Sequence, residues 1–210
     1  MVEALPDSVK PERQRLRWLL GLFCALVVLL SLSGEKFTAA LRYERDAVLA
    51  GQYWRLLTAH LVHGRVEHLL LNLAGLVVIA VLFARDFRPL QWLAIGLIST
   101  IAIDIGFVWF EPQLQWYVGL SGVLHGLLGA GAVTWWRHES KPLALALSAI
   151  LVGKLTWEQT HGALPFSGDL PVVVNAHLYG AIGGVIAGLI VWAFSRSGSV
   201  GRAQDWPPGE

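Results

Sequence analysis

Charged residues are scarce in this sequence. Lys, Arg, Asp and Glu make up 15% of its 210 residues, against about 25% in a soluble globular protein, whereas 55% of the residues are hydrophobic. Cysteine is almost absent, because Cys24 is the only one and cannot form a disulfide within the chain. No basic stripe with interleaved aromatic residues is present and the formal net charge is only +1, so nucleic acid is not an expected partner. These shortages indicate that the lipid bilayer is the protein's environment.

Long apolar runs account for the shortage of charge. A bilayer core about 30 Å thick is crossed by roughly 20 mostly apolar helical residues. The basic start before the first run can also mark a cleavable signal peptide, but the run is long for that role and more runs follow, which favours a retained helix. We therefore predict an all-α, polytopic bundle of six transmembrane helices, at 16–32, 67–83, 90–110, 121–136, 142–158 and 174–194.

Lys and Arg are distributed unevenly among the connecting segments. They occur before the first predicted helix, after the second and fourth, and in the tail, whereas 111–120 and 159–173 contain neither. The long segment 33–66 has both signs of charge in near balance. Because cytoplasmic loops are rich in Lys and Arg, we place both termini in the cytoplasm. The predicted regions are a basic cytoplasmic N-terminus at 1–15, one six-helix domain at 16–194 and a disordered cytoplasmic tail at 195–210.

In this orientation the second, fourth and sixth helices all begin at the outer face. Ser121 lies at the start of the fourth helix and His177 lies a few residues inside the sixth. His68 and Asn72 lie at the start of the second helix. We therefore expect these four side chains at a similar depth near the outer leaflet.

Glycines spaced by four residues form one stripe on each of two predicted helices. The stripes are Gly122 and Gly126 in the fourth helix, and Gly180, Gly184 and Gly188 in the sixth. Small residues at this spacing let membrane helices approach closely. If the stripes face each other, Ser121 and His177 come towards hydrogen-bond range. The alternative is ordinary helix packing without a catalytic role.

Four motifs resemble the rhomboid family of membrane serine proteases. Gly119-Leu120-Ser121-Gly122 is similar to its GxSG signature, Ala176-His177-Leu178-Tyr179-Gly180 to its AHxxG signature, His63, His68 and Asn72 to its HxxxxHxxxN pattern, and Trp54-Arg55 to the Trp-Arg pair of its first outer loop. The resemblance covers about 50–190. The longer string GLSGVLHG, residues 119–126, resembles more specifically the rhombosortase subgroup.

The resemblance implies a rhomboid-like six-helix fold and an intramembrane serine endopeptidase that uses no metal and no cofactor. It also implies a bacterial cytoplasmic (inner) membrane protein whose active site faces the outer, periplasmic side. The subgroup implies that the substrates are single-span membrane proteins with a C-terminal Gly-Gly-type anchor, met within the lipid bilayer. No oligomeric state is implied.

The chemistry assigns a role to each motif residue. A serine hydroxyl is a weak nucleophile until a neighbouring base takes its proton, so Ser121 is the expected nucleophile and His177 the general base and acid. Preorganised donors must stabilise the oxyanion, and His68, Asn72 and the Ser121 backbone N–H at a helix N-terminus are the candidates. Structural hydrogen bonding is the alternative for His68 and Asn72. Accessory candidates are Gly119, Leu120 and His125.

Two residues depart from the common pattern. Many rhomboids carry a Tyr four residues after the serine, where this chain has His125. That side chain either stacks on His177 or supplies a second titrating group. Asp104 lies within the third predicted helix, where an ionisable residue suggests function. It either orients His177 or, as we favour, forms a structural pair with Lys154.

Several other polar and aromatic residues have expected structural roles. His63 and Arg55 are expected to order the outer loop, and His60 and His161 to be solvated. The Trp residues near helix ends are expected to anchor the protein at the membrane interface, as Trp92, Trp109 and Trp192 suggest.

Two other functions remain as alternatives. A metal-dependent membrane hydrolase would draw its ligands from His60, His63, Glu67 and His68, but the sequence has no HExxH motif. A catalytically inactive rhomboid relative that binds membrane proteins would be expected to have lost the serine or the histidine, and this chain retains both.

Overall fold

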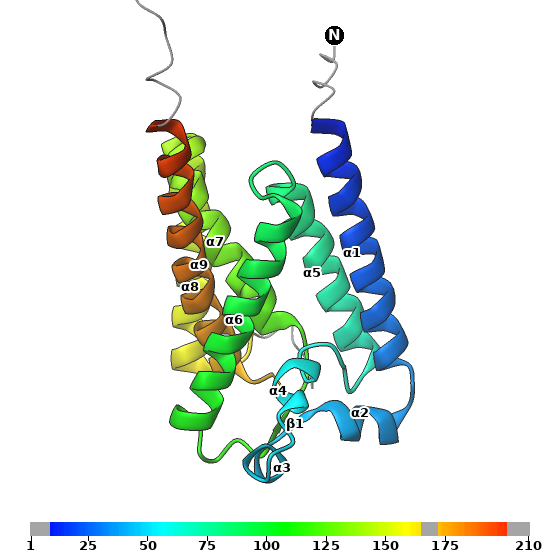
Figure 1. Ribbon diagram of the computed structural model, residues 1–210. Coiled ribbons are helices and arrows are strands. Elements are labelled where there is room, and N and C mark those ends of the chain that lie inside the picture. Colours follow the sequence, from blue (N-terminus) through cyan, green and yellow to red (C-terminus); the bar gives the residue numbers. More distant parts are fainter. Residues whose placement is uncertain (1–8, 165–171, 201–210) are drawn as a thin grey trace, which may run out of the picture.

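The computed structural model describes residues 9–164 and 172–200, and most of these residues are helical. The long helices are α1 (Val9–Ser31), α5 (Val66–Phe83), α6 (Pro89–Phe110), α7 (Ser121–His138), α8 (Lys141–His161) and α9 (Val174–Val200). They form a bundle in which the start of α1 and the end of α9 lie at the same end (Figure 1). The opposite end carries the short elements α2 (Glu35–Leu41), β1 (Tyr43–Glu44), α3 (Arg45–Leu49) and α4 (Trp54–Thr58).

Four described helices are long and apolar enough to cross a bilayer. They are Pro11–Ser31, Val66–Phe83, Pro89–Phe110 and Val174–Phe194. Helices α7 and α8 match the other two predicted spans in position but do not reach the same hydropathy. Apolar side chains on the outer surface of the bundle are exposed, as Trp18, Leu22 and Leu29 are on α1. The chain is therefore an all-α, polytopic integral membrane protein.

Two helix ends differ from the prediction. Helix α1 begins at Val9 instead of residue 16, because the polar residues before the apolar run include good helix formers such as Glu12 and Arg13. Helix α9 continues to Val200, six residues beyond the predicted helix end at 194. No proline interrupts α9 there. Residues 1–8 and 201–210 of the predicted termini lie outside the described chain.

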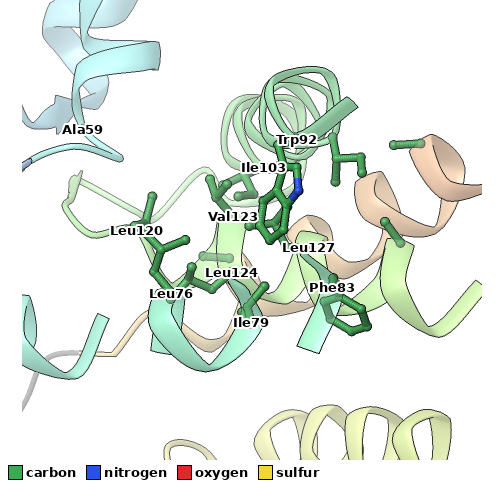
Figure 2. Close-up of a cluster of buried hydrophobic side chains, with 14 of the residues drawn as sticks. Ala59, Leu76, Ile79, Phe83, Trp92, Ile103, Leu120, Val123, Leu124 and Leu127 are labelled. Atoms are coloured by element: carbon green, nitrogen blue, oxygen red, sulfur yellow. The ribbon is translucent and has the colours of Figure 1, made fainter. Parts of the chain in front are cut away.

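The core is built around α7. Leu76, Ile79 and Phe83 of α5 and Trp92 and Ile103 of α6 pack around Leu120, which directly precedes α7, and Val123, Leu124 and Leu127 of α7 (Figure 2). The predicted interfacial role of Trp92 is wrong: its side chain is 5% exposed and packs edge-on against Phe87. It shares the inward face of α6 with Ile95 and Ser99, whereas Trp109 is exposed as expected.

The two glycine stripes face each other. A Cβ added at Gly180 would meet the backbone of Gly122, and a Cβ at Gly184 would meet the backbone of Gly126. One turn further on, a Cβ at Gly188 would lie 3.0 Å from the Cα of Ala130. Helices α7 and α9 therefore touch backbone to backbone, as the stripes predict, and the geometry of this seam sets the geometry of the residues at its end.

Polar contacts to the backbone tie together the short elements that lie between α1 and α5. Arg55 Nη1 donates to the carbonyl oxygens of Ala39 and Arg42, both at 2.8 Å, so its predicted role in ordering the loop is confirmed. Strand β1 pairs antiparallel with β2 (Trp116–Tyr117), with Tyr43 opposite Tyr117. This pairing fixes the segment that leads into α7.

Candidate active site

Ser121 and His177 meet where α7 and α9 both begin. Ser121 is the first residue of α7, and its Oγ lies 2.9 Å from His177 Nε2. The His177 side chain is buried, with 4% of the residue exposed. Small residues make this contact feasible, because a Cβ at Gly122 would lie 2.8 Å from the carbonyl oxygen of Ala176. A nucleophile and its base thus stand at hydrogen-bond distance, although 56 residues separate them in the sequence.

A carboxylate that the sequence patterns did not reveal lies on the other side of the imidazole. Glu158 Oε2 of α8 is 2.9 Å from His177 Nδ1, and Glu158 is 3% exposed. Its other oxygen accepts from the Lys154 ammonium at 2.6 Å. The sequence did contain a sign of this carboxylate. Lys154 and Glu158 are two ionisable residues four positions apart near the end of the fifth predicted helix, where charged residues suggest function.

Asp104 has a different partner from the one predicted. Its Oδ1 lies 3.3 Å from His60 Nε2, whereas Lys154 bonds Glu158, so the expected Asp104–Lys154 pair is wrong. His60 was also expected to be solvated, but it is 2% exposed. The ring that packs against His60 belongs to Tyr117, a distant residue whose contact the local sequence around His60 does not reveal. His161, in contrast, is exposed and stacks on Trp157.

The His60 ring supports the loop before the serine. It packs against Tyr117 with ring centroids 5.5 Å apart, and the Tyr117 hydroxyl donates to the carbonyl oxygen of Gly119 at 2.7 Å. Burial raises the pKa of Tyr117, which keeps the phenol protonated as a donor. Asp104, His60 and Tyr117 therefore form a polar support beneath the turn that precedes Ser121.

Gly119 combines an unusual backbone conformation with a close neighbour. Its φ is 122°, which side chains rarely allow, and a Cβ there would lie 2.6 Å from Cε1 and 3.0 Å from Nε2 of His68. The His68 imidazole thus lies against the loop two residues before Ser121. Leu120, the residue between them, is 2% exposed and packs into the core.

Asn72 belongs to a hydrogen-bonded cluster with His63. Its Nδ2 lies 3.0 Å from His63 Nε2 and 3.0 Å from the carbonyl oxygen of His68. His63 Nδ1 lies 3.1 Å from the Ser31 hydroxyl, so the ring joins α1 to α5. Burial, with a smaller effect of His68, lowers the pKa of His63 to about 3. Both amide N–H groups of Asn72 are engaged, so a donor role in catalysis would require one of them to change partner.

His125 stacks on His177 and forms a hydrogen bond with the backbone of Ser121. Its ring lies 4.1 Å from that of His177, with 19° between the planes. Its Nδ1 is 2.7 Å from the Ser121 carbonyl oxygen, so Nδ1 carries the proton and Nε2 is an unprotonated acceptor. Nε2 is buried and has no hydrogen-bond partner among the described residues.

His125, Glu158 and His177 offer ligand atoms within 4.8 Å of one another, close enough to consider a metal ion. The Lys154 ammonium, however, already supplies a cation to Glu158 at 2.6 Å. Two nearly parallel imidazoles also direct their in-plane lone pairs side by side and not towards one point. The cluster is therefore better described as an ion-pair network beside a serine and a histidine.

The comparisons with known proteins fit this geometry. The Rhomboid domain matches residues 50–194. RHOMBOID-like protein 5 of Arabidopsis thaliana is 31% identical over 173 residues, which cover 79% of this chain and 52% of that protein. The Rhomboid protease GlpG of Salmonella newport is 28% identical over 152 residues, covering 67% and 53%. The Inactive RHOMBOID-like protein 8 of Arabidopsis thaliana is 29% identical over 99 residues, covering 46% and 28%. The chain spans about half the length of the first two of these relatives.

Proposed function

The chain belongs to the rhomboid family, and from that premise we propose that it is an intramembrane serine endopeptidase. Ser121 is the nucleophile and His177 the general base and acid. The observation that carries the proposal is the 2.9 Å contact between Ser121 Oγ and His177 Nε2. A serine with a base at this distance is activated for attack on a carbonyl carbon.

The reaction proceeds by acyl transfer. His177 Nε2 takes the hydroxyl proton as Ser121 Oγ attacks the scissile carbonyl, and the resulting imidazolium gives that proton to the leaving amine. Water then attacks the acyl-enzyme with His177 again as the base, and releases the carboxyl product. No step needs a metal or a cofactor.

Two groups are placed to stabilise the oxyanion. The Ser121 backbone N–H lies at the N-terminus of α7, where the first N–H groups of a helix have no partner within the helix. The His68 ring lies against Gly119, beside the same turn. One such donor is worth on the order of 3 kcal/mol in the transition state. Asn72 supports His68 through its bond to the His68 carbonyl oxygen, and acts as a donor itself only if it releases a partner.

The membrane placement extends the same proposal. All six long helices cross a bacterial inner membrane, and both termini are cytoplasmic. Support comes from the shared end of α1 and α9 in Figure 1 and from the absence of Lys and Arg in 111–120. Helices α7 and α8 cross although they are less apolar, because α7 is enclosed by neighbouring helices and the Lys154–Glu158 pair neutralises the charge on α8.

The string GLSGVLHG, residues 119–126, resembles the rhombosortase subgroup, and this resemblance supports a substrate class. We assign to the protein single-span membrane proteins that end in a Gly-Gly-type anchor, cut beside the outer leaflet. Co-expression with candidate anchored proteins, followed by mass spectrometry of the released termini, tests this assignment. Release in wild type and its loss in Ser121→Ala is the expected result, and unchanged anchors in both would contradict the substrate class.

The alternative of an inactive, membrane-protein-binding relative has one observation in its favour, because a relative of this chain is named inactive. A fluorophosphonate probe separates the two functions without any substrate. Labelling of the wild type at Ser121, lost in Ser121→Ala and His177→Ala of equal thermal stability, identifies an enzyme. A folded wild type that resists the probe and cleaves no anchor is a binder.

A further inference from the structure

The carboxylate of Glu158 completes a line of three groups through the imidazole. Ser121 Oγ and Glu158 Oε2 each lie 2.9 Å from a nitrogen of His177, on Nε2 and Nδ1 respectively. Resting on the proposed function, we infer that Glu158 is a positioning residue, held by Lys154, that converts the serine–histidine pair into a Ser-His-Glu triad.

The first consequence is the tautomer of His177. An ionised carboxylate accepts hydrogen bonds only, so Nδ1 must carry the proton that it shares with Glu158. Nε2 is then unprotonated and faces the Ser121 hydroxyl as an acceptor, which is the form a general base needs. When Nε2 takes the serine proton, the imidazolium lies beside a negative charge that stabilises it.

The second consequence concerns Lys154. An unpaired carboxylate buried at this depth is costly, and a cation within hydrogen-bond distance offsets that cost. Lys154 occupies Oε1 at 2.6 Å, which leaves Oε2 for His177. The ammonium is 3.5 Å from His177 Nδ1 and so holds the carboxylate without occupying its bond to the imidazole. Lys154 thus keeps the Glu158 carboxylate ionised and oriented towards His177.

The placement of Glu158 on α8 separates a functional role from simple packing. The buried residues of this helix are Ala144, Leu151 and Glu158, spaced by seven along one narrow stripe. Ala and Leu are sufficient to dock a helix, whereas a carboxylate on the same stripe weakens docking unless it is paired, and here one of the two partners of Glu158 is His177. The last residue of the stripe, Glu158, therefore places a negative charge beside His177.

The test measures Ser121 labelling by a fluorophosphonate probe against pH in detergent micelles, with thermal stability alongside. In Glu158→Gln we expect the labelling rate to fall by about 10²-fold or more, since the amide keeps the shape but loses the charge. The pH midpoint of the rate should also move lower, because the imidazolium loses its anionic neighbour. The other groups facing His177 are unchanged in this variant: Ser121 and His125 on α7, Lys154 on α8 and His68 on α5.

Two further variants make the test decisive. Glu158→Asp keeps the charge and should recover part of the rate with the midpoint of the wild type. Glu139→Gln removes an exposed carboxylate between α7 and α8 and should leave rate and midpoint unchanged. Should Glu158→Gln fail to fold, Lys154→Met/Glu158→Gln removes both charges together, and a rate at least tenfold below wild type is expected.

The outcomes distinguish this inference from the proposed function. Wild-type rate and midpoint in Glu158→Gln, or wild-type rate in the double variant, overturns the triad while leaving Ser121 and His177 in place. Equal labelling of wild type and Ser121→Ala overturns the proposed function itself. A lower melting temperature with an unchanged midpoint and rate assigns Glu158 to helix docking alone.

Discussion

His125 lies flat against His177, with ring centroids 4.1 Å apart and 19° between the ring planes. The same side chain donates from Nδ1 to the Ser121 carbonyl oxygen at 2.7 Å. A residue one turn after the serine therefore contacts both members of the proposed dyad. The stacking that the sequence left open is present, and the question that remains is whether the ring also takes part in proton transfer.

Substituting His125 answers that question. If stacking is its main role, His125→Tyr and His125→Phe should keep the cleavage rate within a few-fold of wild type, whereas His125→Ala should lose more because nothing supports the His177 ring. Cleavage rate against pH, at matched membrane yield, is the measurement. A loss of tenfold or more in both aromatic variants, with unchanged stability, would make His125 a working acid–base group.

The contact between α7 and α9 predicts the effect of a single methyl group. In Gly184→Ala the new Cβ meets the backbone of Gly126, so the helices must move apart. Overpacking of this kind typically costs about 1–3 kcal/mol, and it should also slow Ser121 labelling by lengthening the contact to His177. Gly153→Ala on α8 is the matched control, since no atom lies within 4 Å of its Cβ position. Equal melting temperatures for the two variants would refute the backbone seam.

His68 and Asn72 should differ in what they contribute. His68→Ala removes the proposed oxyanion donor, and we expect anchor cleavage to slow by on the order of 10²-fold with little loss of stability. Asn72→Ala removes bonds to His63 and to the His68 backbone, so its main effect should be a lower melting temperature. Parallel measurement of rate and melting temperature checks both. If His68→Ala instead lowered the melting temperature and Asn72→Ala instead slowed cleavage, Asn72 would be the oxyanion donor and His68 the structural residue.

His63 predicts an acid sensitivity of the fold. Its pKa is lowered from 6.5 to about 3 in the folded protein, so between these values the unfolded chain binds a proton that the folded chain does not. Stability must therefore fall as the pH drops below 6.5, by about 3 kcal/mol at pH 4.5 from this group alone. The melting temperature of His63→Gln should fall less steeply than that of wild type from pH 7 to 4.5. His161→Gln, altered at an exposed ring, should follow the wild-type slope.

The orientation is tested with single cysteines in a Cys24→Ser background. Gln113→Cys, exposed between α6 and β2, should react with an impermeant thiol reagent added to intact cells. Glu139→Cys, exposed between α7 and α8, should react only after the cells are opened. Reaction of Glu139→Cys in intact cells would reverse the proposed topology and move the site to the cytoplasmic side.

Sequence could predict the features that depend on periodicity and local motif. The apolar runs located the long helices, and the shared depth of three helix starts placed Ser121 close to His177. The facing glycines followed from their spacing, because backbone contact requires small residues at successive turns. In each case the prediction needs only the residue spacing within a helix or motif and the order of the helices along the chain.

The partners that were missed depend on which faces of separate helices turn towards each other. Asp104 and Glu158 lie near the C-terminal ends of α6 and α8, and hydropathy cannot tell which of them faces His177. The burial of His60 was missed because its ring packs against Tyr117, which comes from a distant part of the chain. Trp92 was misplaced for the same reason, since it lies near one end of α6 but on the buried face of that helix.

The seven-residue stripe on α8 also bears on how the protein responds to its lipids. A bilayer thicker or thinner than the bundle is accommodated in part by helix tilt, and the packing of each helix against its neighbours sets how far it tilts. The seam between α7 and α9 is locked by backbone contact, whereas α8 is held along Ala144, Leu151 and Glu158. A membrane thickness that tilts α8 should therefore change the distance between Glu158 and His177, and acyl-chain length becomes a variable for the proposed proteolysis that leaves Ser121 and the substrate unchanged.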